Sequence, residues 1–140
     1  MGRINMGRVI VGGLLAGLIV NISEFVLNTY VIGAEMEASM KALNLPPIGG
    51  SQIMWFVIFS FVLGIALVWL YAAIRPRFGP GVTTAVCAAL VVWTLAYLYP
   101  TLFMLVIGLF PQGPMLISLV WGLVEVVIAG VAGAWAYTEA

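Results

Sequence analysis

Residues 53–74 read IMWFVIFSFVLGIALVWLYAAI and contain no charged side chain. The hydrocarbon core of a bilayer is about 30 Å thick, and a helix needs about 20 mainly apolar residues to cross it. This stretch meets both requirements, length and composition. The sequence therefore predicts a membrane-spanning helix here.

Three more stretches of the same character lie on either side of this one. They are bounded by charged residues, Gly or Pro, and they cover residues 9–32, 82–107 and 115–137. Pro100 lies inside the third of the four spans, where its missing N–H should kink the helix or end its regular part early. We expect an all-α fold, an integral membrane four-helix bundle that forms a single transmembrane domain over residues 1–140.

The composition of the whole chain supports this class of fold. Of its 140 residues, 64% are hydrophobic and 7% are charged, whereas soluble globular domains carry about 25% charged residues. Five basic and five acidic residues give no net formal charge, so nothing indicates a nucleic-acid partner. The chain has no His and a single Cys, Cys87, which excludes Ser-His-Asp catalysis and the usual zinc and haem ligand sets. We expect no cofactor, no metal and no enzymatic activity.

The basic residues indicate the orientation in the membrane. The connections between spans one and two and between spans three and four hold only Lys41, whereas the opposite ends hold the remaining four, Arg3, Arg8, Arg75 and Arg77. By the positive-inside rule, both termini of this multi-pass protein are cytoplasmic. At the cytoplasmic end we also expect a lipid-facing aromatic belt, formed by Trp69, Tyr71, Trp135 and Tyr137.

The longest connection, residues 33–52, joins the first two spans on the external side. Within it Met36, Met40 and Leu43 share one helical face, and Glu37 and Lys41 form an i, i+4 pair on another face. This pattern predicts a short amphipathic helix over residues 34–45 that lies on the membrane surface. The simpler interpretation is a surface segment that binds no ligand.

Polar residues form a stripe in the first span. Gly17, Asn21, Glu24 and Asn28 follow one another at helical spacings, so they project from one face. An ionised carboxylate at this depth costs roughly 2.5 to 3.5 kcal/mol on insertion scales. The stripe must therefore face other helices, a partner subunit or water.

A second carboxyl group, that of Glu125, lies near the middle of the last span. Counting a helical rise of about 1.5 Å per residue puts it near the depth of Glu24, and adds Ser60, Tyr97 and, slightly lower, Thr94 to the same layer. No Lys or Arg lies within a span to neutralise the carboxyls, which leaves protonation, a bound cation or access of water. The candidate ion- or ligand-binding residues are Asn21, Glu24, Asn28, Tyr97 and Glu125.

The alternative is that these polar side chains only hold the helices together. Hydrogen bonds between membrane helices contribute about 0.6 to 2 kcal/mol each. Two carboxyl groups and two amides at compatible depths exceed what helix adhesion needs, but both interpretations stay open on the sequence.

Small residues gather in the cytoplasmic half of the spans. Helix backbones approach closely where such residues meet. We therefore expect a bundle that is narrow at its cytoplasmic end and open outward around Glu24, although ordinary helix packing or homodimerisation explains the same pattern. The small residues are Gly13, Gly17, Ala85, Ala88, Ala89, Ala129, Gly133 and Ala136.

Three stretches carry a resemblance to known sequences: residues 21–28 (NISEFVLN), 71–81 (YAAIRPRFGPG) and 120–125 (VWGLVE). On these stretches, and over nearly its whole length, the chain resembles a group of small four-span bacterial inner-membrane proteins. In layout, with a long first external loop, it is loosely similar to the bacterial domain-of-unknown-function family numbered 1761. The resemblance implies a location in the bacterial inner (plasma) membrane and implies no activity.

Three functions fit these observations. The first is a small transporter or channel-like protein, linked to protons or cations and homo-oligomeric, because four spans enclose little space. The second is a non-catalytic accessory or scaffold subunit that holds membrane lipids or a larger membrane complex through its apolar faces. The third, a membrane enzyme acting on a lipid or a quinone, is the weakest because no nucleophile and base are spaced for catalysis.

Overall fold

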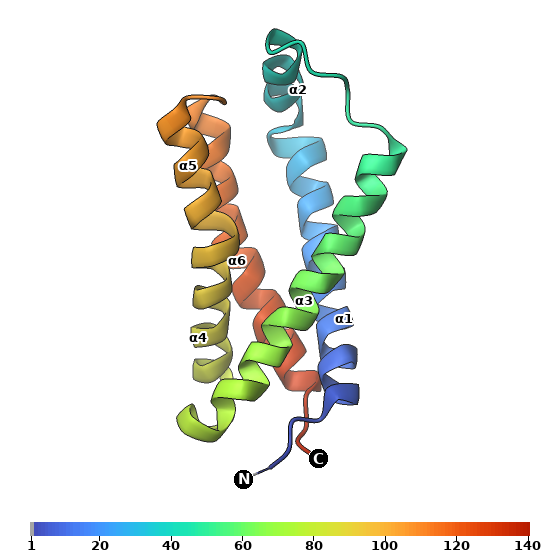
Figure 1. Ribbon diagram of the computed structural model, residues 1–140, viewed down its shortest axis with the longest axis vertical. Coiled ribbons are helices and arrows are strands. Elements are labelled where there is room, and N and C mark those ends of the chain that lie inside the picture. The colour runs from blue at the N-terminus through green and yellow to red at the C-terminus, as the bar shows by residue number, and fades with distance from the viewer. Residues whose placement is uncertain (1) are drawn as a thin grey trace.

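The computed structural model describes residues 2–140, and these residues form helices and no strands (Figure 1). The predicted all-α bundle is confirmed. Two short π-helical segments, η1 and η2, continue the helices that precede them. In chain order the elements are α1 (Met6–Val26), η1 (Leu27–Val31), α2 (Gly33–Ala42), α3 (Gly50–Phe78), α4 (Val82–Trp93), η2 (Thr94–Leu98), α5 (Tyr99–Ile107) and α6 (Gln112–Ala136).

Four helical stretches are long and apolar enough to cross a membrane: Met6–Val31, Gly50–Phe78, Val82–Ile107 and Gln112–Ala136. They match the four predicted spans, and their ends differ by a few residues. The first begins earlier because the Asn5 side chain caps it, accepting a hydrogen bond from the Arg8 N–H at 3.2 Å. The second continues beyond its apolar part through Arg75 and Arg77, and Gly79, in a positive-φ conformation, ends it.

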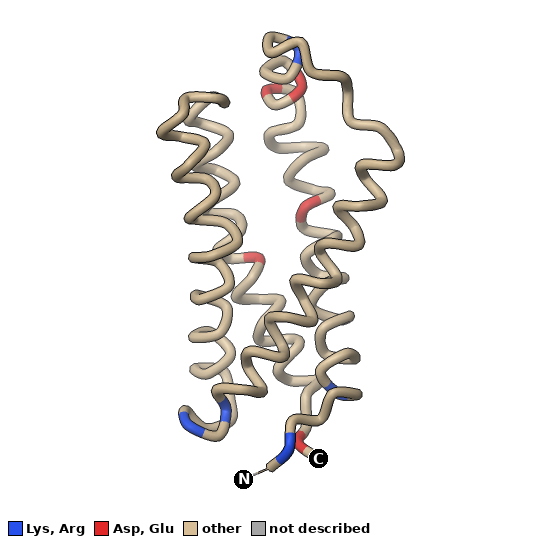
Figure 2. The backbone as a smooth tube through the Cα atoms, viewed as in Figure 1, with Lys and Arg blue, Asp and Glu red and all other residues tan. Residues whose placement is uncertain are grey.

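The two termini lie at one end of the bundle, together with the turn between α3 and α4 (Figure 1). The connection from α2 to α3 and the turn between α5 and α6 lie at the other end. Figure 2 shows the arginines gathered at the end with the termini and the one lysine at the opposite end. The grouping on which the predicted orientation rests is therefore present in space.

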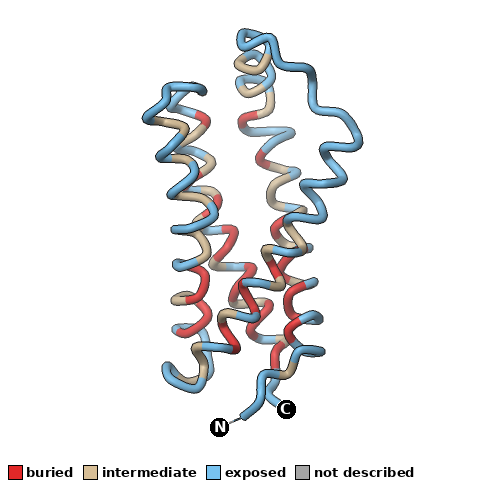
Figure 3. The backbone as a smooth tube through the Cα atoms, viewed as in Figure 1, coloured by how far each residue is buried: buried red, intermediate tan, exposed pale blue. Residues whose placement is uncertain are grey.

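Most buried residues lie in the half of the bundle that holds the termini (Figure 3). There α1 packs against both α3 and α6, and α4 packs against α6. A Cβ built on Gly64 of α3 would collide with the backbone of Gly13 and Gly17 in α1, so glycine is what allows these helices to cross so closely. The predicted narrow end is present at the predicted residues.

The other half of the bundle is open. All residues from 50 to 59 of α3 are exposed, and α5 has no buried residue. Figure 1 shows α3 and α1 diverging from α5 and α6 in this half. The helices thus diverge in the half where the outward opening was expected, and an opening at Glu24 itself stays a prediction.

The short helix α2 ends earlier than the predicted residue 45. Asn44 takes a left-handed conformation (φ 56°), and the Leu45 N–H bonds back to the Met40 carbonyl, a pattern that ends a helix. No residue of α2 is buried, and Figure 1 shows it beyond the end of α1. Its position on a membrane surface stays a prediction.

Two members of the expected aromatic belt do not face lipid. Tyr71 and Tyr137 are buried, and their rings meet edge to face at 6.0 Å. Tyr71 accepts a hydrogen bond from the Gly81 N–H, and Tyr137 accepts one from the Asn5 N–H. The belt prediction was wrong for these two tyrosines. Their rings pack into the core at the narrow end, and backbone N–H groups there donate to their hydroxyls. Trp135, at 85% exposed, does face outward.

Candidate functional site

Glu125 is the centre of the polar cluster inside the bundle. Glu125 belongs to the apolar helix α6 and is only 3% exposed. The Ser23 hydroxyl of α1 donates to its Oε2 at 3.2 Å, and the Tyr97 hydroxyl of η2 donates to its Oε1 at 3.3 Å. Three spans therefore meet at one carboxyl group, because each supplies a side chain at the same depth.

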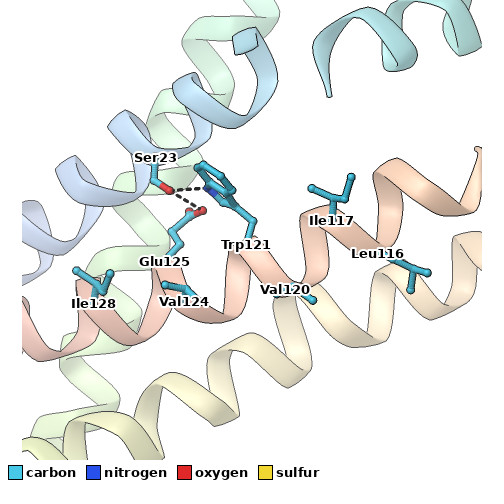
Figure 4. Close-up of a pocket in the computed structure, with 8 residues that line it drawn as sticks. All are labelled: Ser23, Leu116, Ile117, Val120, Trp121, Val124, Glu125 and Ile128. Atoms are coloured by element: carbon cyan, nitrogen blue, oxygen red, sulfur yellow. Dashed lines mark hydrogen bonds between the residues drawn. The ribbon is translucent and has the colours of Figure 1, made fainter. Parts of the chain in front are cut away.

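Trp121 extends this cluster by one hydrogen bond. It lies one helical turn before Glu125 on α6, and its indole Nε1–H donates to the Ser23 Oγ at 2.8 Å (Figure 4). The indole, the serine hydroxyl and the carboxyl thus form a short chain in which every proton points toward Glu125. Such a chain favours an acceptor at its end, because each donor is already committed.

Glu24 brings a second carboxyl group to the cluster from α1. It directly follows Ser23, whose hydroxyl donates to Glu125. The Asn28 amide donates to Glu24 twice, to its Oε2 at 3.0 Å and to its backbone carbonyl at 2.9 Å. Because Ser23 bonds to Glu125, its neighbour Glu24 lies near the depth of Glu125, as the depth count predicted.

The charges of this cluster are not balanced by basic side chains. The arginines lie at the end of the bundle with the termini, and the lysine lies at the other end (Figure 2). Two carboxylates at one depth repel each other where water is scarce, so a proton, a cation or access of water must relieve the repulsion. In this respect the cluster differs from an ordinary hydrogen bond between membrane helices.

Two of the five predicted site residues lie apart from Glu125. Asn21 turns to α3, where its amide donates to the Val57 carbonyl at 3.4 Å, and Asn28 reaches the cluster only through Glu24. Ser60 and Thr94, also expected in the layer, bond to carbonyls of their own helices. The structure brings together Glu24, Glu125 and Tyr97, and it leaves Asn21 outside.

The sequence did not single out Ser23 or Trp121. The stripe of polar residues in the first span pointed to positions 21, 24 and 28, and Ser23 is off that stripe because it faces α6. Trp121 carries a usable signal, since it precedes Glu125 by four residues and so shares its helical face. An indole N–H inside a membrane span needs an acceptor, which predicts a polar partner on a neighbouring helix.

Both π-helical segments lie beside the cluster. Asn28 belongs to η1, in which the Ile32 N–H bonds to the Leu27 carbonyl, and Tyr97 belongs to η2. Pro100, two residues after η2, supplies no N–H, so the helix before it takes in an extra residue and shifts its hydrogen-bond register. The kink expected at Pro100 takes this form, and the shift affects the segment that carries Tyr97.

A groove of about 660 Å³ lies beside the cluster, between α1 and the outer half of α6 (Figure 4). Its floor is formed by Ser23, Trp121 and Glu125, and Glu24 does not line it. Its walls are apolar side chains of α6: Leu116, Ile117, Val120, Val124 and Ile128. The groove therefore has apolar walls and a single acidic side chain, Glu125, at its floor.

Few groups here could ligate a metal. Within residues 2–140, no three His, Cys, Asp or Glu side chains gather closely enough to hold a metal ion. Two carboxyl groups, an amide and two hydroxyls remain, and these oxygen ligands suit a proton or a hard cation better than a soft transition metal.

Comparison with known proteins adds no family to this geometry. No protein-family model, curated protein or solved structure matches the chain. The structure and the composition establish a multi-pass membrane protein with four candidate spans.

Proposed function

We propose that this chain is a small proton-linked membrane transporter, in which Glu24 and Glu125 form the proton- or cation-binding site. The observation that carries the proposal is that the buried Glu125 bonds to Ser23, the neighbour of Glu24, so that two carboxyl groups lie at one depth with no basic side chain at that depth. Helix adhesion alone would be served by Ser23, Tyr97 and one carboxyl. The second carboxyl adds a repulsion that only a proton or a cation relieves.

The shape of the bundle supports transport rather than a fixed pore. The half with the termini is closed by glycine and alanine contacts, and the other half is open. A binding site at the boundary between a closed half and an open half is reached from one side at a time. A second arrangement, in which the closed half opens, would complete a transport cycle, and a second copy of the chain would supply the wall that four spans lack.

Reconstitution in liposomes tests this function. Proton flux is followed with an enclosed pH-sensitive dye under an imposed membrane potential, for the wild type and for Glu24→Gln, Glu125→Gln and Glu37→Gln. Glu37 lies exposed in α2, so it is a matched control for the same chemical change. We expect flux in the wild type and in Glu37→Gln, and loss of flux in the other two. Equal flux in all four proteins, or none in the wild type, refutes the proposal.

The location we assign is the bacterial inner membrane, with both termini cytoplasmic. It rests on the four arginines that share one end of the bundle (Figure 2), on the positive-inside rule, and on the resemblance of residues 71–81 to bacterial inner-membrane proteins. Reporter domains fused to the C-terminus and inserted after Asn44 check it. A reporter active only in the cytoplasm should work at the C-terminus and fail in the loop.

A second function has one observation in its favour. The outer end of α3, residues 50–59, touches no other span closely enough to bury a residue, which is what a contact surface for another subunit would show. An accessory or scaffold subunit should then purify with a partner after gentle solubilisation. Glu24→Gln would weaken that assembly and leave proton flux unaffected, the reverse of the outcome expected for a transporter.

A further inference from the structure

The groove between α1 and α6 combines features of a small-molecule site. Its volume of about 660 Å³ lies within the range of roughly 300 to 1,000 Å³ that ligand pockets occupy. The walls offer only hydrocarbon, and the floor offers three polar side chains, Ser23, Trp121 and Glu125. A ligand that fits has an apolar body and one polar group.

The hydrogen bonds on the floor decide what that polar group is. The Trp121 N–H is used by Ser23, and the Ser23 hydroxyl is used by Glu125. The Tyr97 hydroxyl is also committed to Glu125. A ligand carboxylate, phosphate or carbonyl would need a free donor and would meet none among these groups, whereas a ligand N–H would meet a carboxyl oxygen with acceptor capacity left.

The charge of the floor points the same way. Any negative charge that Glu125 or Glu24 carries in the membrane interior has no Lys or Arg beside it to balance it. An anionic group would add to that charge, and a neutral donor would leave it unbalanced. A cationic group would neutralise it and form a charge-assisted hydrogen bond.

Access to the floor is from the lipid. The flanking α6 side chains Val120, Val124 and Ile128 are exposed on the outside of the bundle, so the groove opens toward acyl chains. An amine with a hydrocarbon body dissolves in the bilayer, and its ammonium group is charged at neutral pH as a lysine side chain is. Such a molecule can reach Glu125 without crossing the narrow half of the bundle.

We infer that the α1–α6 groove binds a lipid-soluble amine, with its ammonium group on Glu125 and its hydrocarbon body along Val120 and Val124. This inference rests on the proposed function and names the substrate class of that site. When the ammonium group binds, the proton held by the two carboxyls is released, so one positive charge replaces another. Because Glu24 does not line the groove, the proton leaves on the side of Glu24 while the amine stays on the side of Glu125.

Photolabelling of the full chain in lipid nanodiscs tests the inference. The probe is decylammonium with a diazirine at the end of its chain, and labelled residues are mapped by mass spectrometry. We expect saturable labelling of α6 between Leu116 and Val124. Unlabelled decylammonium should compete, and decanoate should not. In Glu125→Gln, half-saturation should need an about tenfold higher probe concentration, as loss of a charge-assisted hydrogen bond implies.

Two tryptophan variants separate this inference from the proposed function. Val120→Trp fills the groove and leaves both carboxyls in place, so labelling should disappear. Val106→Trp is the matched control, because Val106 is 88% exposed on α5 and lies outside the groove. Competition by decanoate as strong as by decylammonium, or equal labelling of the two variants, overturns the amine site. Loss of flux in Glu125→Gln would still stand as evidence for the transporter in that case.

Discussion

Glu125 shows how one side chain can be enclosed by partners that the sequence scatters. Its hydrogen-bond donors come from positions 23 and 97, on α1 and η2. Each donor is a hydroxyl, which can turn toward a carboxyl group whatever the state of its proton. The two hydroxyls can therefore stay bonded to Glu125 in either protonation state, which the proposed function requires.

Ser23→Ala should weaken the contact between α1 and α6. It removes the acceptor of Trp121 and a donor to Glu125, and each lost interhelical hydrogen bond costs about 1 kcal/mol. Unfolding of the purified protein in mixed micelles measures the change in free energy. Ser60→Ala is the control, because the Ser60 hydroxyl bonds to the Phe56 carbonyl of its own helix. Equal stabilities of the two variants would show that Ser23 holds nothing between helices.

Among the helices, α1 and α3 depend on glycine for their crossing. Gly13 and Gly17 in α1 face Gly64 in α3, and a Cβ on Gly64 would collide with backbone atoms of the other helix. Backbone atoms cannot rotate aside as a side chain can, so the helices would have to move apart. The closed half of the bundle is built on this contact.

Gly64→Ala should destabilise the fold by about 1 to 3 kcal/mol, the usual cost of adding a methyl group to a tightly packed site. Gly50→Ala serves as the control, since Gly50 has open space around it at the start of α3. The same unfolding measurement in mixed micelles compares the two variants. A Gly64→Ala protein as stable as the control would mean that α1 and α3 do not cross where the structure places them.

The four spans follow from the sequence because hydrocarbon thickness sets their length and a run of apolar residues reveals them. Their ends are harder to predict, since α3 keeps its helix through Arg75 and Arg77, where lipid no longer limits the composition. The shared depth of Glu24 and Glu125 could be predicted from the helical rise alone. The rotation of each helix could not, and this is why Asn21 points to α3 and why Tyr71 and Tyr137 are buried.

The molecule as a whole is closed at one end and open at the other, and cysteine accessibility should report this shape. In a Cys87→Ala background, Glu24→Cys should react with a water-soluble maleimide added from outside. Ile22→Cys, which lies on the opposite, lipid-facing side of α1 and is 58% exposed, should not react, and neither should Ala16→Cys in the closed half. Protection of all three cysteines would contradict a water-accessible opening around Glu24.

The groove distinguishes the two carboxyl groups of the cluster. Glu125 lines the groove that opens to lipid, and Glu24 does not line it. In the proposed function, a ligand from the bilayer and a proton from water therefore meet at these two side chains. The proposed function depends on Glu24 and Glu125 holding a proton when no other cation is bound.

Reaction with dicyclohexylcarbodiimide tests that dependence most directly, because this lipid-soluble reagent forms a stable adduct with a protonated carboxyl group. In the wild-type protein in nanodiscs, peptide mapping should find the adduct on Glu125 or Glu24 and not on Glu37, which is exposed in α2. Modification of Glu37 with both membrane carboxyls unmodified would contradict the account, since it would mean that no proton is held between Glu24 and Glu125.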